Sequence, residues 1–392
     1  MKKKYFIALS LILIAALLLA CSPEQNNNNK EQNITENTDI SDTAADSEDM
    51  EENLVDNSDE LAGLYNNFEE EEKDDETLKT EQGLENTDHN SMVFNEAEEI
   101  YYSPFTGQVV DELYLRKALL VVVENSPAAR PQSGLEEASL VYEVLAEGGI
   151  TRFLALYWDQ IPEKIGPVRS ARPYIIDIAR EYNGLLLHAG ASPEGFAMLA
   201  EGDLEHLDQI YKSRYYWRSS DRRPPHNLYT GKKRIVDYLE SLIGQEYQER
   251  FSFQQISFIK PQDKQADMIR IPYWGGTYVT YRYNNQENQY YRYYGYLEKA
   301  HLLDNNKQIT ANNIIVQFAR TKQIDAIGRL NITLNGRGRS IIFSDGIVVE
   351  GYWEKDRNGL TKYYQNTGER IKLNPGQTWI EIVPDTIDIE YI

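Results

Sequence analysis

LLVVVE, at Leu119–Glu124, is an apolar, β-branched run that ends in an acid. Runs of this kind, bounded by turn residues, are typical of buried strands, and LVYEVL (140–145) and TRFLALYW (151–158) follow the same pattern. In PYIIDIAREY (173–182), apolar side chains recur at helical spacing behind a proline that suits the first turn. Strands alternating with helices predict a mixed α/β domain, which we place at residues 100–250. Shorter helices are expected at 192–202 and 231–244.

The sequence changes character beyond residue 250. Short β-type runs such as TYVTYRY (277–283) and RSIIFSDGIVVEGYW (339–353) are separated by Asn, Gly and Asp. They predict an all-β or mainly β domain at 251–392, for which we consider a small barrel, so the folded part is of the α+β class. Nine tyrosines between Tyr273 and Tyr296 suit cross-strand pairing, which we favour, or a stacking surface for a sugar or base.

The first 21 residues, MKKKYFIALSLILIAALLLAC, resemble a bacterial export signal. Three lysines precede an apolar run that is short for a bilayer span of ~20 residues, and small residues lead to Cys21, the only cysteine in the sequence. We expect a lipoprotein signal peptide at 1–20 and a lipid anchor on Cys21, which places the chain on the extracytoplasmic face of the cell membrane. The alternative is a signal-anchor helix with an incidental cysteine. A lone cysteine excludes internal disulfides.

Residues 22–99 carry almost all of the net charge. They contain 26 acidic residues and three lysines, a net charge of −23, against −22 for the whole chain. With few apolar residues to bury, we expect residues 21–99 to be a lipidated cysteine followed by a disordered acidic tether. The folded part is then almost neutral.

IGPVRSARP (165–173) sets Arg169, Ser170 and Arg172 directly before the helix expected at Pro173. A helix N-terminus exposes free N–H groups and the positive end of the macrodipole, so two guanidiniums beside it suit a phosphate or carboxylate. Ser170 would cap the helix or donate to the ligand. In the alternative interpretation, the arginines pair with internal acids and stiffen a loop. The motif alone leaves both open.

Two further segments favour an anionic ligand. EGGITRF (147–153) has a double glycine before Arg152, which permits close backbone approach. The segment 211–234 contains eight Lys and Arg against Asp221, with aromatic residues interleaved, so it is either a polyanion-binding patch or a solvated basic loop. Export argues against nucleic acid and for an anionic envelope polymer or lipid phosphate. From this segment we take four ligand-binding candidates, Arg222, Arg223, His226 and Asn227.

Catalytic signals are weak. HAGASPEG (188–195) lies between an expected strand and helix, but Glu194 stands where a nucleophile elbow needs glycine, and Ser192 suits a helix N-cap better. Glu143 and Glu147 are weak candidates for a general base, as is His226. The histidines show no paired metal-ligand spacing, so we expect neither a metal nor another cofactor.

Six segments in order resemble the YerB-like lipoprotein family of Gram-positive bacteria, which is built from an N-terminal and a C-terminal domain of unknown function. They are VVVENSPAARPQSGL (121–135), VYEVLAEGGITRFLALY (141–157), IGPVRSARPYIIDIA (165–179), RRPPHNLYT (222–230), FSDGIVVEGYWEK (343–355) and LNPGQTWIEIVP (373–384). The resemblance implies an exported two-part lipoprotein and supplies no catalytic residues. The motif positions taken as site candidates are Glu124, Asn125, Arg130, Glu143, Glu147, Arg152, Arg169, Ser170, Arg172, His188, His226 and Asn227.

We therefore expect a membrane-anchored lipoprotein of undetermined activity that binds an anionic envelope ligand. The alternatives are an envelope enzyme of phosphoryl or glycosyl chemistry, and a protein-interaction scaffold without catalysis.

Overall fold

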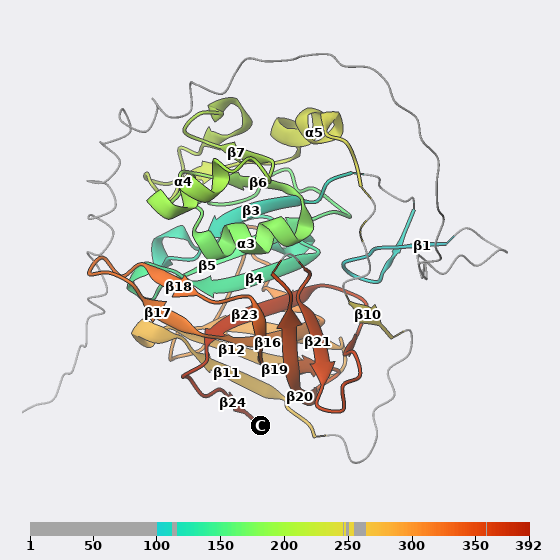
Figure 1. Ribbon diagram of the computed structural model, residues 1–392. Helices are drawn as coiled ribbons and strands as arrows, with labels where there is room; N and C mark the ends of the chain where they lie inside the picture. Colours follow the sequence, from blue (N-terminus) through green and yellow to red (C-terminus); the bar gives the residue numbers. More distant parts are fainter. Residues whose placement is uncertain (1–99, 112–115, 246, 248–250, 255–263, 358) are drawn as a thin grey trace, which may run out of the picture. The chain divides into compact units, whose positions relative to one another are not determined.

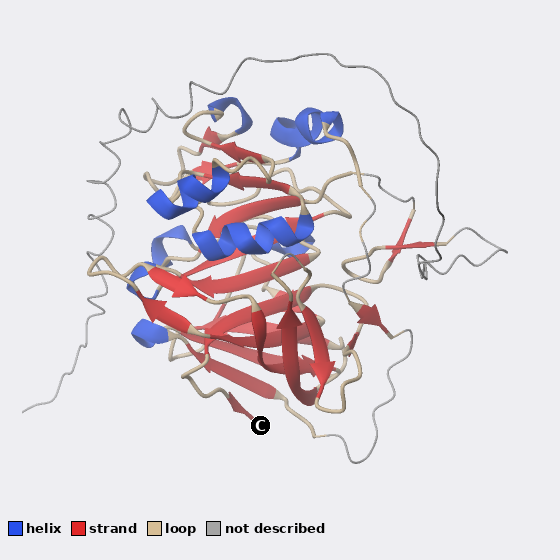
Figure 2. Cartoon of the chain, in the orientation of Figure 1, coloured by secondary structure: helices blue, strands red, loops and turns tan. Residues whose placement is uncertain are grey.

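The computed structural model describes residues 100–111, 116–245, 247, 251–254, 264–357 and 359–392. The expected signal peptide, Cys21 and the acidic tether lie outside the described residues. Strands predominate over helices in the described parts (Figure 2). None of the described helices is long and apolar enough to cross a membrane.

A ten-stranded sheet, in the order β21-β20-β19-β16-β23-β4-β5-β3-β6-β7, runs through both halves of the sequence (Figure 1). The halves meet where β23 pairs in parallel with β4. This mixture of strands and helices confirms the α+β class, while the boundary expected near residue 250 stays a prediction. The strands are β3 (Leu119–Glu124), β4 (Leu140–Leu145), β5 (Thr151–Tyr157), β6 (Leu185–His188), β7 (His206–Asp208), β16 (Asn313–Ala319), β19 (Gly336–Ser344), β20 (Ile347–Lys355), β21 (Lys362–Gln365) and β23 (Thr378–Pro384).

A second, six-stranded sheet has the order β14-β13-β12-β11-β24, with β15 also paired to β13. Among the described residues the strands of the C-terminal half therefore form open sheets rather than a small barrel. Tyr283 and Tyr290 lie opposite each other with ring centroids 5.0 Å apart, which is the cross-strand pairing that we favoured. The strands are β11 (Met268–Pro272), β12 (Tyr278–Asn284), β13 (Gln289–Tyr294), β14 (Lys299–Ala300), β15 (Thr310–Ala311) and β24 (Glu390–Tyr391).

The described residues of the N-terminal half include three α-helices: α3 (Pro173–Tyr182), α4 (Pro193–Leu199) and α5 (Lys232–Ser241). Helices α3 and α4 lie against one face of the ten-stranded sheet (Figure 1), and the hydroxyls of Tyr142 on β4 and Tyr182 on α3 are 2.6 Å apart. As expected, Ser192 caps α4 by accepting a hydrogen bond from the Gly195 amide. Helix α5 ends at Ser241 rather than at residue 244, because Leu242 is already extended.

The remaining elements are short. The strands are β1 (Tyr101–Tyr102), β2 (Val109–Val110), β8 (Trp217–Arg218), β9 (Leu228–Tyr229), β10 (Ser252–Phe253), β17 (Thr321–Gln323), β18 (Leu330–Ile332) and β22 (Lys372–Leu373). The 3-10 helices are η2 (Pro127–Ala129), η3 (Leu135–Glu137), η4 (Glu147–Gly149), η5 (Ser213–Tyr215) and η6 (Trp274–Gly276).

A fully buried ion network joins the two sheets. Arg292 on β13 donates from Nη2 to Oε2 of Glu143 on β4 at 2.6 Å, and its Nη1 lies 3.4 Å from Oε1 of Glu381 on β23. The hydroxyls of Tyr273 and Tyr281 donate to Glu381 at 2.7 and 2.5 Å. Two carboxyl groups from neighbouring strands thus share one guanidinium in the interior.

Burial controls the protonation of Glu381 in this network. It raises the pKa of Glu381, and the neighbouring charge of Glu143 raises it further against the opposing effect of Arg292, to about 8. Glu381 therefore favours its protonated form at neutral pH, which reduces the negative charge that faces Arg292. His301 accepts from Arg292 Nε at 3.1 Å, and burial lowers its pKa well below the usual value, so it adds no charge.

We predict that Arg292→Met destabilises the fold by about 3–5 kcal/mol, because it removes the only cation that the described residues place between the buried acids Glu143 and Glu381. Urea unfolding followed by circular dichroism measures the change. The matched control is Arg282→Met on β12, whose ion pair with Glu298 is half exposed and is expected to contribute about 1 kcal/mol or less. Equal stabilities of the two variants would contradict the role assigned to the buried network.

Candidate functional site

The candidate site lies where parallel strands of the large sheet end. β3, β6 and β7 run parallel, and their last residues are Glu124, His188 and Asp208. β5 is antiparallel and begins at the same edge, with Arg152 opposite Glu124. In open sheets of this kind, ligands bind outside the carboxyl ends of the strands.

The loop 165–172 brings its arginines to this edge. β6 pairs with β3 only as far as Val121, and the loop then takes the place of β6 beside the end of β3. The Glu124 amide donates to the Pro167 carbonyl, and the Arg169 amide donates to the Val122 carbonyl, both at 2.9 Å. Helix α3 then begins at Pro173, as the sequence predicts.

Glu147, on η4, holds two arginines. Arg172 donates to both carboxylate oxygens of Glu147, at 2.5 and 2.9 Å, while Arg152 Nη2 lies 3.6 Å from the same carboxylate. Burial alone would raise the pKa of Glu147, but the charge of Arg152 and the hydrogen bond from Arg172 outweigh it and lower the pKa to about 2. For Arg172, the structure therefore contains the internal pairing that we considered as the alternative to ligand binding.

Ser170 lies between the arginines, and its carbonyl accepts from Arg152 Nη1 at 2.9 Å. The N-cap position of α3 is occupied by Arg172, and no side chain of the described residues caps the helix there. Ser170 therefore does not have the capping role that we considered for it.

Glu124 forms a second cluster with Arg169 and His226. Its Oε1 accepts from Ser126 Oγ at 2.7 Å and from His226 Nδ1 at 2.8 Å, and Arg169 Nε lies 3.8 Å away. Burial would raise the pKa of Glu124, but the hydrogen bond from His226 and the charge of Arg169 lower it. Glu124 Oε2 is buried without a hydrogen-bond partner among the described residues. Because Nδ1 donates to the carboxylate, a neutral His226 ring is an acceptor at Nε2.

His188 has a structural place at this edge. It is fully buried, its Nδ1 donates to the Gly190 carbonyl at 2.8 Å, and its Nε2 lies 3.1 Å from His206 Nδ1. Burial lowers the pKa of both rings, that of His206 to about 4, so both are neutral at physiological pH.

The contacts given for the other candidates of the basic segment are with backbone carbonyls, not with Glu124 or Glu147. Arg222 donates to the carbonyls of Ala129 and Pro131. The Asn227 amide donates to the Ser219 carbonyl at 2.9 Å. Arg223 is exposed.

Glu143, Asn125 and Arg130 belong to the opposite face of the sheet. Glu143 faces Arg292, and Asn125 donates to Glu143 Oε1 at 3.1 Å. Arg130 donates to Asn125 Oδ1 and lies over the Tyr294 ring, 4.3 Å from its centroid. The sheet therefore separates Glu143 from the arginines, which argues against Glu143 as a general base that acts beside them.

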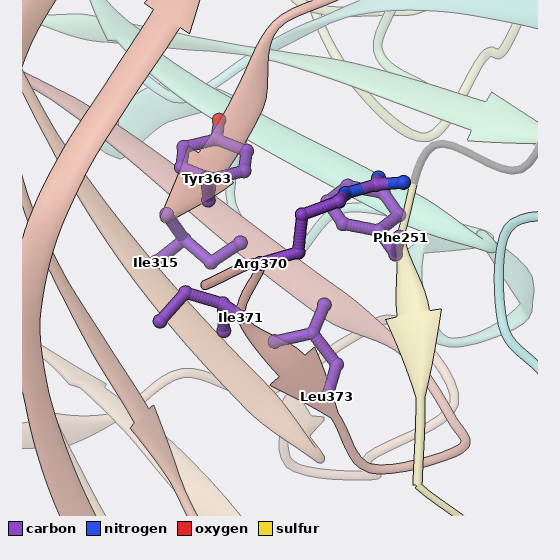
Figure 3. A pocket seen from close by; sticks show the side chains of 6 residues that line it. All are labelled: Phe251, Ile315, Tyr363, Arg370, Ile371 and Leu373. Atoms are coloured by element: carbon purple, nitrogen blue, oxygen red, sulfur yellow. The ribbon is translucent and has the colours of Figure 1, made fainter. Parts of the chain in front are cut away.

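A narrow pocket lies away from this edge (Figure 3). It is lined by Phe251, Ile315, Tyr363, Arg370, Ile371 and Leu373. The lining is mostly apolar and includes none of the residues predicted from the sequence. No three His, Cys, Asp or Glu side chains of the described residues are grouped so that they could hold a metal ion.

Family models match both halves of the chain. The model described as "Protein of unknown function (DUF3048) N-terminal domain" matches residues 105–246, and the corresponding "C-terminal domain" model matches residues 269–380. "Putative lipoprotein YerB" of Bacillus subtilis (strain 168) is 34% identical over 293 residues, which cover 72% of this chain and 86% of that protein. A crystal structure of YerB protein from Bacillus subtilis superposes with a TM-score of 0.66 at 32% identity, covering 74% of this chain and 99% of that chain.

We predict that Glu147→Gln lowers the free energy of unfolding by about 3 kcal/mol at pH 7. The pKa of Glu147 falls from 4.5 to about 2 on folding, and each unit corresponds to ~1.4 kcal/mol. The folded-state pKa lies below the ordinary value of 4.5, so the contribution of Glu147 is full above pH 4.5 and is lost as the pH falls towards 2. The difference between wild type and variant should therefore shrink between these pH values. Urea unfolding at pH 3, 5 and 7 measures it.

Glu194→Gln is the control, because Glu194 is half exposed and pairs with Arg329 on the surface. A Glu147→Gln difference that is independent of pH would rule out the assigned ion pairs.

Proposed function

The chain belongs to the family of proteins with the DUF3048 N-terminal and C-terminal domains, and from this premise we propose that it is a lipid-anchored extracytoplasmic protein that binds an anionic group of a cell-envelope ligand. It is a YerB-like lipoprotein of undetermined activity. The ligand would lie against the arginines at the carboxyl edge of the large sheet.

The gathering of three arginines at one edge of the sheet supports this proposal. Arg152, Arg169 and Arg172 all lie near Glu124 or Glu147. The pKa values of both carboxyl groups are lowered, so both are ionised at neutral pH and help to orient the guanidiniums. The N-terminus of α3 adds the positive end of its macrodipole.

Arg169 is the arginine best placed to meet the ligand. Its side chain is 16% exposed, against 8% for Arg172 and 7% for Arg152. Arg152 and Arg172 then act mainly by shaping the loop around Ser170.

The ligand that fits best carries hydroxyl groups beside its anionic group. An anion alone would lie close to two ionised carboxylates. Glu124 Oε2, buried and without a hydrogen-bond partner among the described residues, is an acceptor for a hydroxyl donor. Sugar phosphates and glycerol phosphates, which occur in envelope polymers and lipids alike, combine both features.

An enzymatic role finds less support in the geometry. A carboxylate with a pKa of about 2 is a weak base near neutral pH, and Glu147 has such a pKa. His226, with Glu124 behind its Nδ1, is the remaining candidate for acid–base chemistry. Catalysis therefore stays an alternative that centres on His226.

The lipid anchor gives the first prediction of the proposed function. Cys21→Ala removes the only thiol available for lipidation, and each buried acyl methylene contributes ~0.8 kcal/mol of membrane affinity. Cell fractionation should find the variant in the soluble fraction and the control Ser22→Ala in the membrane fraction. A Cys21→Ala protein that stays in the membrane would instead support the signal-anchor interpretation.

The second prediction concerns Arg169. Loss of one hydrogen bond to a charged group costs about 1.5–3 kcal/mol, so Arg169→Gln should weaken binding roughly 10- to 100-fold. Calorimetric titration at low salt with inorganic phosphate and with glycerol 3-phosphate measures the affinity, and glycerol 3-phosphate should bind more tightly. Arg320→Gln, at an exposed arginine of the C-terminal half, is the control. Equal affinities of wild type and Arg169→Gln would disprove the site.

A further inference from the structure

The N-terminal half carries a basic surface that the anion site does not use. It consists of the exposed side chains of Lys212, Arg214, Arg218, Arg223, Lys232 and Arg234, and we call it the basic face. None of these six forms an ion pair with an acid of the described residues, whereas the adjacent Lys233 lies 3.8 Å from Glu163.

Contacts within the segment 212–234 make the basic face one surface. Strands β8 and β9 pair, with Trp217 opposite Tyr229 and their rings stacked. The Thr230 hydroxyl donates to the Tyr215 carbonyl at 3.0 Å, and Arg234 Nη1 donates to the Arg214 carbonyl at 3.2 Å. The two ends of the segment therefore lie side by side, and its last three residues form the first turn of α5.

Folding does not account for these charges. Lys232, Lys233 and Arg234 form the first turn of α5, which contains no acid and has no side-chain cap. Cations at this end of a helix oppose the macrodipole, so local stability would favour acids there. A surface that departs from local preference in this way is expected to serve binding.

The same chain contains a polyanion of matching charge. Residues 69–76, EEEEKDDE, hold seven acids and one lysine and lie outside the described residues. They are joined to Ile100 by residues 77–99, and these 23 residues reach about 80 Å at full extension. A compact body of about 290 residues is about 50 Å across, so the basic face is within reach.

We propose that the acidic segment 69–76 binds the basic face of its own chain. Covalent connection gives it an effective concentration in the millimolar range, which an external polyanion has to match. Opposite charges on exposed side chains supply the attraction, so the contact weakens as salt rises. The contact also sets a threshold for external polyanions, which must displace the segment from Arg223 and its neighbours.

Zero-length carbodiimide crosslinking of the full chain tests this contact, because it joins carboxylates to lysines at ion-pair distance. We expect mass spectrometry to find crosslinks from residues 69–76 to Lys212 and Lys232, about fivefold more abundant than to the exposed Lys322 and Lys362 of the C-terminal half, and lost at about 0.5 M salt. Crosslinks spread evenly over exposed lysines, or none from residues 69–76, would overturn the proposal.

Charge reversal provides the matched comparison. Arg214→Glu with Arg218→Glu leaves both reactive lysines in place but reverses the local charge, so crosslinking should fall about fivefold. Arg337→Glu with Arg339→Glu, at exposed arginines on β19, should leave it unchanged. Thermal unfolding establishes that each variant is folded.

Two further outcomes are distinguishable. Crosslinks between isotope-labelled and unlabelled copies would show that a second chain is the occupant and would overturn the intramolecular contact. The proposed contact is independent of the proposed anion site. Arg214→Glu with Arg218→Glu should reduce crosslinking without changing the affinity for phosphate, and Arg169→Gln should weaken phosphate binding without changing the crosslinks.

Discussion

The guanidinium of Arg292 is the constraint on which the rest of the structure depends. A buried cation requires acidic partners, and Glu143 and Glu381 supply them from two strands that are far apart in the sequence and adjacent in the sheet. A shift of either strand by one residue would turn its carboxyl group to the other face. The network thus fixes the register of β4 against β23 and the position of the second sheet, while its net contribution to stability is modest because burial of charge is costly.

This network on one face of the sheet also positions the site on the other. Asn125 and Thr151 both contact Glu143 Oε1, at 3.1 and 2.5 Å, and they are the chain neighbours of Glu124 and Arg152. Successive side chains of a strand point to opposite faces of the sheet. The contacts that fix Asn125 and Thr151 on the face of Glu143 therefore also orient Glu124 and Arg152 on the opposite face. The carboxylate and the guanidinium at the carboxyl edge are therefore held by a polar interior as well as by the loops around them.

The sequence predicts the local features of this fold and misses those that depend on distant contacts. The strand at Leu119–Glu124, the start of α3 at Pro173 and the cap at Ser192 are encoded in a few adjacent residues. So is the turn between β19 and β20, where Asp345 and Gly346 adopt φ values of 57° and 69°. The pairing of β23 with β4 has no local signal, because parallel neighbours share no turn. The contact between Glu124 and His226 has no local signal either, because the two residues are 102 positions apart. The sequence therefore marks each of them as a candidate without indicating that they are in contact.

Internal pairing of the arginines and ligand binding by them are compatible. A carboxylate that holds a guanidinium by two hydrogen bonds fixes its plane before the ligand arrives, which lowers the entropy cost of binding. The same carboxylate also cancels most of the attraction at long range, so selectivity at this edge must come from short, directed hydrogen bonds. The basic face is built in the opposite way, with exposed cations that no acid of the described residues orients. Binding there should depend strongly on salt and little on ligand shape, whereas binding at the carboxyl edge should show the reverse dependence.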